Sequence, residues 1–71
     1  MGASFDIKCN KAIAKADKRF PRKAGMDRTI RVANDGAIEV IDLPAISESP
    51  DKHLQDFKNA KAVIRAYPNT L

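Results

Sequence analysis

The N-terminal third of the chain changes from an alternating pattern to a helical one. Residues 4–9 alternate apolar and polar side chains, which is typical of a short strand with one buried face. From Lys11 onward the apolar residues recur at helical spacing, and Asn10 can cap the helix that begins there. Pro21 ends this helix near residue 20, because the residue before a proline avoids helical backbone. The pattern therefore predicts a strand followed by a helix.

Two apolar segments, 28–33 and 37–43, flank a turn-forming sequence and predict a β-hairpin. A three-residue loop over 34–36, with Gly36 in the left-handed conformation, sets apolar residues of the two strands opposite one another. A two-residue loop would mix polar and apolar partners on both faces, so we expect the longer loop. The second strand has apolar residues on both faces, which is typical of a central strand. The expected cross-strand pairs are Val32 with Ile38, Ile30 with Val40, and Arg31 with Glu39.

The last third of the chain opens with a helix start signal. Ser49 is a favoured capping residue and Pro50 suits the first helical position. Asp51 follows where the helix dipole favours an anion. Apolar residues then recur at helical spacing as far as Tyr67, and Pro68 cannot continue a helix. These signals predict one helix from Pro50 to Tyr67.

Together the elements predict an α+β fold, in one small domain over residues 1–71, with the order β-α-β-β-α. We expect a three-stranded, mainly antiparallel sheet with the second hairpin strand at its centre and both helices on one face. The first strand is expected to pair antiparallel with the central strand, and a parallel pairing through the helix is the alternative. A chain of 71 residues has no room for a second domain. The free energy gained by burying apolar surface is close to the entropic cost of ordering the chain, so the net stability is small. Additional stabilisation in a homodimer is therefore compatible with the sequence.

Cysteine content and hydropathy indicate in which cellular compartment the protein is expected. Cys9 is the only cysteine, which excludes an intramolecular disulfide and favours a reducing, cytoplasmic location. No apolar segment approaches the roughly 18 residues that a membrane-spanning helix needs, so no membrane partner is expected.

Positive charge is concentrated in the first half of the chain. Residues 1–31 hold nine basic and three acidic residues, a net charge of +6, whereas residues 32–71 hold four basic and six acidic residues, a net charge of −2. The predicted helix presents Lys11, Lys15 and Lys18 on one side, so an acidic partner is expected to bind there. The candidate partner- or nucleic-acid-binding residues are Lys11, Lys15, Lys18, Arg19, Arg22, Lys23, Arg28 and Arg31.

Residues suited to catalysis are few. His53 is the only histidine and has no evident catalytic partner, so we expect it to be a partly buried residue at a helix start. Cys9 follows the apolar alternation of its segment and is expected to be a small core residue. One cysteine and one histidine cannot form a structural zinc site, and the sequence has no glycine-rich phosphate loop. The sequence therefore predicts no enzyme, no metal and no cofactor.

These features favour a small, non-enzymatic binding protein that docks on a larger protein or protein–nucleic-acid machine as an accessory factor or inhibitor. Chains of this size are common among phage and mobile-element proteins. The alternative is a DNA- or RNA-binding protein that uses the same basic helix and loop. The sequence contains neither the aromatic motifs nor the metal fingers of common nucleic-acid-binding modules. A second candidate contact is the apolar edge formed by Val63 and Tyr67 of the last helix.

Overall fold

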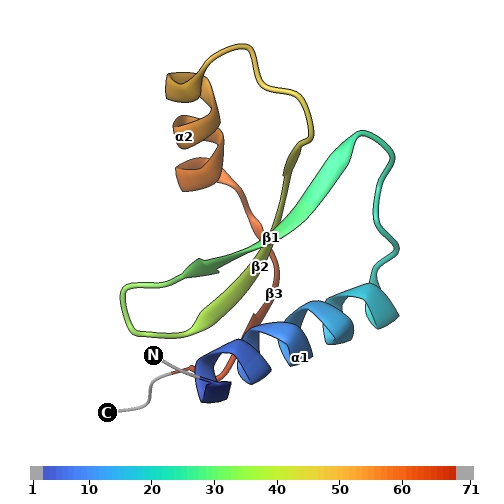
Figure 1. Ribbon diagram of the computed structural model, residues 1–71, viewed down its shortest axis with the longest axis vertical. Helices are drawn as coiled ribbons and strands as arrows, with labels where there is room; N and C mark the ends of the chain where they lie inside the picture. Colours follow the sequence, from blue (N-terminus) through green and yellow to red (C-terminus); the bar gives the residue numbers. More distant parts are fainter. Residues whose placement is uncertain (1–2, 69–71) are drawn as a thin grey trace.

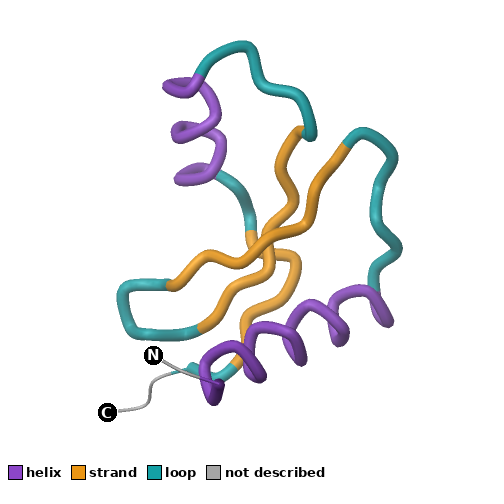
Figure 2. The backbone as a smooth tube through the Cα atoms, in the orientation of Figure 1, coloured by secondary structure: helices purple, strands orange, loops and turns teal. Residues whose placement is uncertain are grey.

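The computed structural model describes residues 3–68, which form two helices and a three-stranded antiparallel sheet. The elements are α1 (Ala3–Arg19), β1 (Met26–Val32), β2 (Ile38–Pro44), α2 (Pro50–Asn59) and β3 (Ala62–Ala66). Strand β2 lies between β1 and β3 (Figure 1), so the α+β class and the central position of the second hairpin strand are confirmed. The predicted element order is wrong, because the chain runs α-β-β-α-β (Figure 2).

The β1–β2 hairpin has the predicted register and the predicted three-residue loop. The Ala33 N–H donates to the Ala37 carbonyl at 2.9 Å, which closes the loop over residues 34–36. Gly36 has a φ of 87°, a conformation that residues with a Cβ rarely adopt. The Asp35 carboxylate also accepts a hydrogen bond from the Ala37 N–H at 3.0 Å. The confirmed partners are Val32 with Ile38, Ile30 with Val40, and Arg31 with Glu39.

Residues 4–9 form the first turns of α1, so the strand predicted there is wrong. The alternation covers only six residues, and Cys9 is the one apolar side chain among them that packs against the core. Cys9 shares a side of the helix with Ala12 and Ala16, at spacings of three and four residues. One continuous helix of 17 residues buries this side without a turn at Asn10.

The final helix starts as predicted but ends earlier. Ser49 caps it by accepting a hydrogen bond from the Lys52 N–H at 3.2 Å, and a proline occupies the first helical position. The helix ends at Asn59, because the backbone of Ala60 is extended, with a ψ of 135°. The predicted continuation to Tyr67 is therefore wrong.

Strand β3 is the third strand of the sheet, the place that was predicted for residues 4–9. It pairs antiparallel with β2, with Ile64 opposite Val40. A register shift beside this pair inserts one extra residue, and Val63 and Ile64 both pack on the core. Both residues are β-branched, which favours a strand. Pairing with β3 satisfies the backbone groups on the second edge of β2, and local periodicity does not report such a non-local contact.

The two helices lie on opposite faces of the sheet, so the prediction that both cover one face is wrong (Figure 1). Ala12 and Ala16 of α1 pack on the face that includes Val40. Ile41, the next residue of β2, points to the other face and is also fully buried. Helix α2 lies on that second side of the sheet, where it contacts β2. A central strand that is apolar on both faces needs cover on both, which one layer of helices cannot give.

Candidate docking surface on helix α1

Helix α1 has a buried side and a basic side. Ala12 and Ala16 are buried, and their small side chains let the helix lie close to the sheet. On the exposed side four lysines follow one another at intervals of three, four and three residues, so they lie on one side of the helix. At a rise of about 1.5 Å per residue the set extends for about 15 Å. We call this set the lysine row; it consists of Lys8, Lys11, Lys15 and Lys18.

The lysine row is exposed, and its charge is largely uncompensated by the residues that the structure describes. Within residues 3–68, no carboxylate lies within ion-pair distance of Lys11, Lys15 or Lys18. The Lys8 ammonium lies 5.6 Å from the centroid of the Tyr67 ring, a cation–π contact that leaves its charge unneutralised. Lys8 is outside the predicted set, because the alternating pattern of residues 4–9 predicts a strand there. A predicted helix that began before Lys8 would include it in the row, because the four lysines follow at intervals of three, four and three residues.

Arg19 and Ile7 lie beside the lysine row. The Arg19 guanidinium is exposed and lies 5.5 Å from the centroid of the Phe20 ring. Ile7 precedes Lys11 by one helical turn, and 51% of its surface is exposed. The exposed surface of α1 therefore combines five positive charges with two large apolar side chains, Phe5 and Ile7.

Arg28, one of the predicted binding residues, is part of the interior. Its side chain is 2% exposed. Its Nε and Nη2 donate to the two carboxylate oxygens of Asp42 at 2.8 and 3.1 Å. Its Nη1 donates to Asp17 of α1 at 3.0 Å and to the Phe20 carbonyl at 2.7 Å. This guanidinium therefore ties β1, β2 and the end of α1 together, and its contacts are made within the chain.

The Arg28 network changes the protonation equilibria of its acids. Two hydrogen bonds from Arg28 hold the pKa of Asp42 below its usual range. The pKa of Asp17 is also lowered, first by a hydrogen bond from Arg22 and then by the bond from Arg28. Reciprocally, the bond to Asp42 raises the pKa of Arg28. All four groups remain ionised at neutral pH, so positive charge is compensated locally here, in contrast to the lysine row.

Arg31, a second predicted binding residue, is also used within the fold. Its Nε donates to Glu39 on the neighbouring strand at 2.8 Å. Its Nη1 donates to the Phe57 carbonyl at 2.7 Å, near the C-terminal end of α2. A cation at this end satisfies a backbone carbonyl and suits the helix dipole. Arg31 therefore links α2 to the hairpin.

Arg22 and Lys23 continue the basic surface beyond α1. Arg22 donates two hydrogen bonds to Asp17, at 2.9 and 3.0 Å, and its side chain is 54% exposed. Lys23 is exposed and borders a small pocket of about 220 Å³, which Phe20 and Val63 also line. Six of the eight predicted residues thus lie on α1 or in the loop that follows it, and Arg28 and Arg31 form internal contacts instead.

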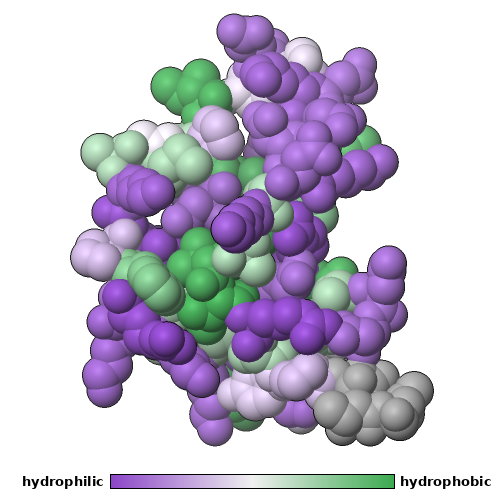
Figure 3. All heavy atoms as spheres, turned by 180° about the vertical axis from the view of Figure 1, so that it is seen from behind, coloured by the Kyte–Doolittle hydropathy of each residue, from purple (hydrophilic) through white to green (hydrophobic). Residues whose placement is uncertain are grey.

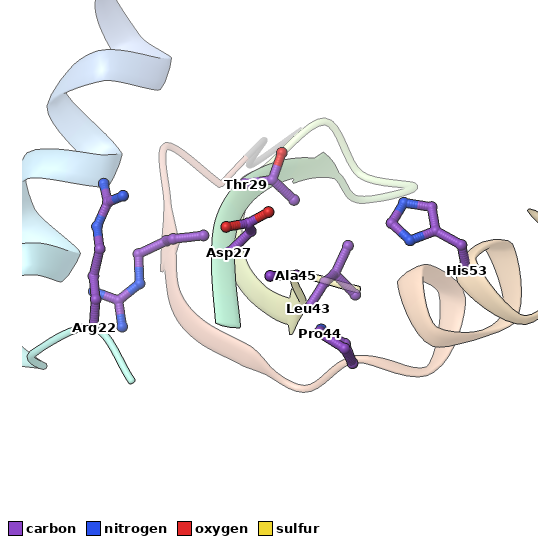
Figure 4. A pocket seen from close by; sticks show the side chains of 8 residues that line it. Arg22, Asp27, Thr29, Leu43, Pro44, Ala45 and His53 are labelled. Carbon is purple, nitrogen blue, oxygen red and sulfur yellow. The ribbon is translucent and has the colours of Figure 1, made fainter. Parts of the chain in front are cut away.

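A separate cleft of about 390 Å³ opens between α2 and the end of the hairpin (Figure 4). His53, in the first turn of α2, is exposed, so the expected partial burial is wrong. Asp27 and Thr29 lie on the strand side of the cleft and His53 lies on the helix side. This is not the arrangement of a nucleophile held beside its base. The lining residues are Arg22, Asp27, Arg28, Thr29, Leu43, Pro44, Ala45 and His53.

Cys9 lies at the margin of the core, so its expected place as a small core residue is met only in part. It is half-buried and packs against the cluster that Ala12 and Val40 belong to. Burial, with a smaller contribution from the nearby Asp6 carboxylate, raises the pKa of the Cys9 thiol. A thiol with a raised pKa is a poor nucleophile at neutral pH.

The part of the chain that the structure describes has no group of three histidine, cysteine or acidic side chains that could hold a metal ion. None of the helices in that part is long and apolar enough to cross a membrane. Comparison with known protein families, with curated proteins and with solved structures finds no match to this chain.

Proposed function

We propose that this chain is a non-enzymatic binding protein that docks through the lysine row of α1 on an acidic surface of a larger protein, as an accessory factor or inhibitor. The observation that carries the proposal is the contrast between the basic residues. Arg28 and Arg31 are compensated by Asp42 and Glu39, whereas the lysine row has no carboxylate partner within residues 3–68. Charge without an internal partner on one helix side is suited to an external one.

The composition of the surface favours a polypeptide partner. Ile7 is half-exposed next to Lys11, and a large apolar side chain beside positive charge is typical of a protein interface. The exposed aromatic rings beside the row, Phe20 and Tyr67, already contact the cations of Arg19 and Lys8. Direct binding of DNA or RNA by the same lysines is the competing function, and the experiment below distinguishes the two.

The proposed mechanism is occlusion by a preorganised helix. Arg28 joins Asp17 of α1 to Asp42 of the sheet, so α1 is held in one orientation before a partner arrives. Binding then requires little ordering of backbone, which reduces its entropic cost. The helix would cover an acidic site that the partner uses for something else. A cytoplasmic location, where Cys9 stays reduced, fits this role.

The test is capture of partners from an extract of the native host with three immobilised proteins. These are the wild type, a lysine-row variant (Lys11→Glu, Lys15→Glu, Lys18→Glu) and a control that reverses three exposed lysines elsewhere (Lys52→Glu, Lys58→Glu, Lys61→Glu). The two variants have the same net charge, so only the position of the reversal differs. Circular dichroism and a thermal melt verify that each is folded.

The proposal predicts that the wild type and the control capture the same acidic protein after nuclease treatment, and that the lysine-row variant does not. Equal capture by the lysine-row variant would show that the row is only a solubility feature. Loss of all captured protein on nuclease treatment would favour nucleic acid as the ligand.

A further inference from the structure

Strand β3 forms an edge of the sheet. The strand order β1-β2-β3 gives β3 one neighbour, and no other strand lies beside it among residues 3–68. Apart from Arg65, the strand is apolar, with the sequence Ala-Val-Ile-Arg-Ala. Seen from behind, the molecule has an apolar patch at its centre, framed by hydrophilic side chains (Figure 3). An apolar edge strand is a site where a further strand can pair.

The backbone of Arg65 points away from the sheet. The bond from the Ala33 N–H to the Ala37 carbonyl fixes the alternation of hydrogen bonds along β2. By this alternation Ile38 and Val40 direct their backbone groups toward β3, where they face Ala66 and Ile64. Arg65 lies between those two partners, so its N–H and carbonyl face outward. These groups are a donor and an acceptor for an added strand.

Helix α1 packs across the face of the sheet that includes Val40, and its Lys8 flank lies toward β3. Lys8, near the start of the helix, contacts Tyr67 just after β3, and Phe20, after its end, lines a pocket with Val63 at the start of β3. The helix and the strand are therefore antiparallel neighbours. On the opposite flank of the helix, Asp17 contacts Arg28 of β1. The acidic flank thus lies toward β1 and the lysine row toward β3.

We propose that the partner binds as an extended acidic segment that adds to β3 as a fourth strand, with its acidic side chains against Lys8 and Lys15. This inference rests on the proposed function and specifies the form of the ligand. Main-chain hydrogen bonds to Arg65 would give affinity, as in other cases of strand addition. The lysine row would select acidic residues on the face of the added strand that lies toward α1. The other side chains of the segment would lie on the opposite face, beside Arg65 and Glu39.

A second copy of the chain fits this edge poorly. Two β3 strands paired edge to edge would bring two lysine rows together, whereas the Arg65 side chains are already paired with Asp35 within each chain. Each chain carries a net charge of +4, so the pairing would be repulsive. An acidic segment meets the same surface with the opposite charge, which is the reason for choosing it as the occupant.

The test uses the full chain, labelled with nitrogen-15, and a blocked peptide of alternating valine and glutamate as the probe. A valine–lysine peptide and an oligothymidylate of equal length are the comparison ligands. Arg65→Pro removes the outward N–H without removing a bond to β2, and proline is tolerated at such an edge position. Arg65→Ala loses the same side chain but keeps the N–H, so it is the matched control. Lys8→Glu with Lys15→Glu tests the charge requirement.

The proposal predicts that the acidic peptide slows hydrogen exchange of the Arg65 amide, and that the lysine peptide does not. Binding should weaken about fivefold from Arg65→Ala to Arg65→Pro, the effect of one lost backbone hydrogen bond. It should weaken about tenfold in the double lysine variant, because two attractive contacts become repulsive. Strand addition would be overturned if the two Arg65 variants bind the peptide equally, the Arg65 amide stays unprotected, and binding still requires the lysines. In that case docking on the lysine row would remain. Binding that is indifferent to lysine reversal would contradict both, and tighter binding of the oligothymidylate would favour a nucleic-acid ligand.

Discussion

Replacing Arg28 by alanine should remove much of the stability of the fold without removing a docking residue. The guanidinium is 2% exposed and makes four hydrogen bonds, two to Asp42 and one each to Asp17 and the Phe20 carbonyl. Breaking a buried ion pair from one side costs about 3–5 kcal/mol, because the remaining charge is left without a partner. The Asp42 side chain is 14% exposed, so water offsets part of this cost and we expect about 2–4 kcal/mol. A chain of 71 residues has a total stability of roughly 4–11 kcal/mol, so the loss is large.

Urea unfolding followed by circular dichroism measures this loss. With a slope near 1 kcal/mol per molar urea, the midpoint should fall by about 2–4 M, or the variant should be unfolded without urea. Arg22→Ala removes an exposed arginine that also bonds to Asp17, and it should change the midpoint little. Arg28→Met combined with Asp42→Leu should regain much of the loss, because a pair of apolar residues leaves no charge unpaired. If Arg28→Ala unfolds at the same urea concentration as Arg22→Ala, the assignment of Arg28 to the interior network is refuted.

Three further predictions concern local structure and pH. Gly36→Val should destabilise the hairpin by more than about 1 kcal/mol, because a β-branched residue resists the positive φ of this position; an unchanged thermal melt would count against the turn. Ser49→Ala should lower the free energy of unfolding by about 0.5–2 kcal/mol, because the helix cap is lost. Chemical shifts that show an intact first turn, together with unchanged stability, would contradict this. The lowered pKa of Asp42 stabilises the fold above the unfolded pKa of about 4, and this stability is lost as pH falls through the lower folded pKa. Acid unfolding curves should therefore show a steeper loss below pH about 4 in the wild type than in Asp42→Asn, and parallel curves would argue against the ion pair.

The elements that the sequence predicts correctly are those with local causes. The hairpin register follows from matching apolar partners around a glycine turn, and the start of α2 follows from the Ser49 cap and the proline after it. Strand β3 is different, because residues 62–66 fit a helical periodicity as well as a strand. Their pairing with β2 is a non-local contact that the local pattern does not contain.

The residues of the candidate site likewise divide into those with a local cause in the sequence and those whose role depends on non-local contacts. Lysine spacing on a helix is local, and it identifies most of the lysine row. The internal roles of Arg28 and Arg31 depend on contacts across the sheet. One signal for these roles is present in the sequence, since the register that pairs Arg31 with Glu39 also places Arg28 opposite Asp42. The bonds from Arg31 to α2 and from Arg28 to α1 have no such signal.

The central claim is that the lysine row of α1 is a docking surface for an acidic protein. The most direct measurement is the dissociation constant of the purified captured protein for the lysine-row variant and for its charge-matched control, at about 50 and 200 mM salt. We expect about tenfold or greater weakening in the lysine-row variant alone, and a loss of affinity with salt well below the roughly 100-fold expected for four contacted phosphates. Equal dissociation constants for the two variants would contradict the claim.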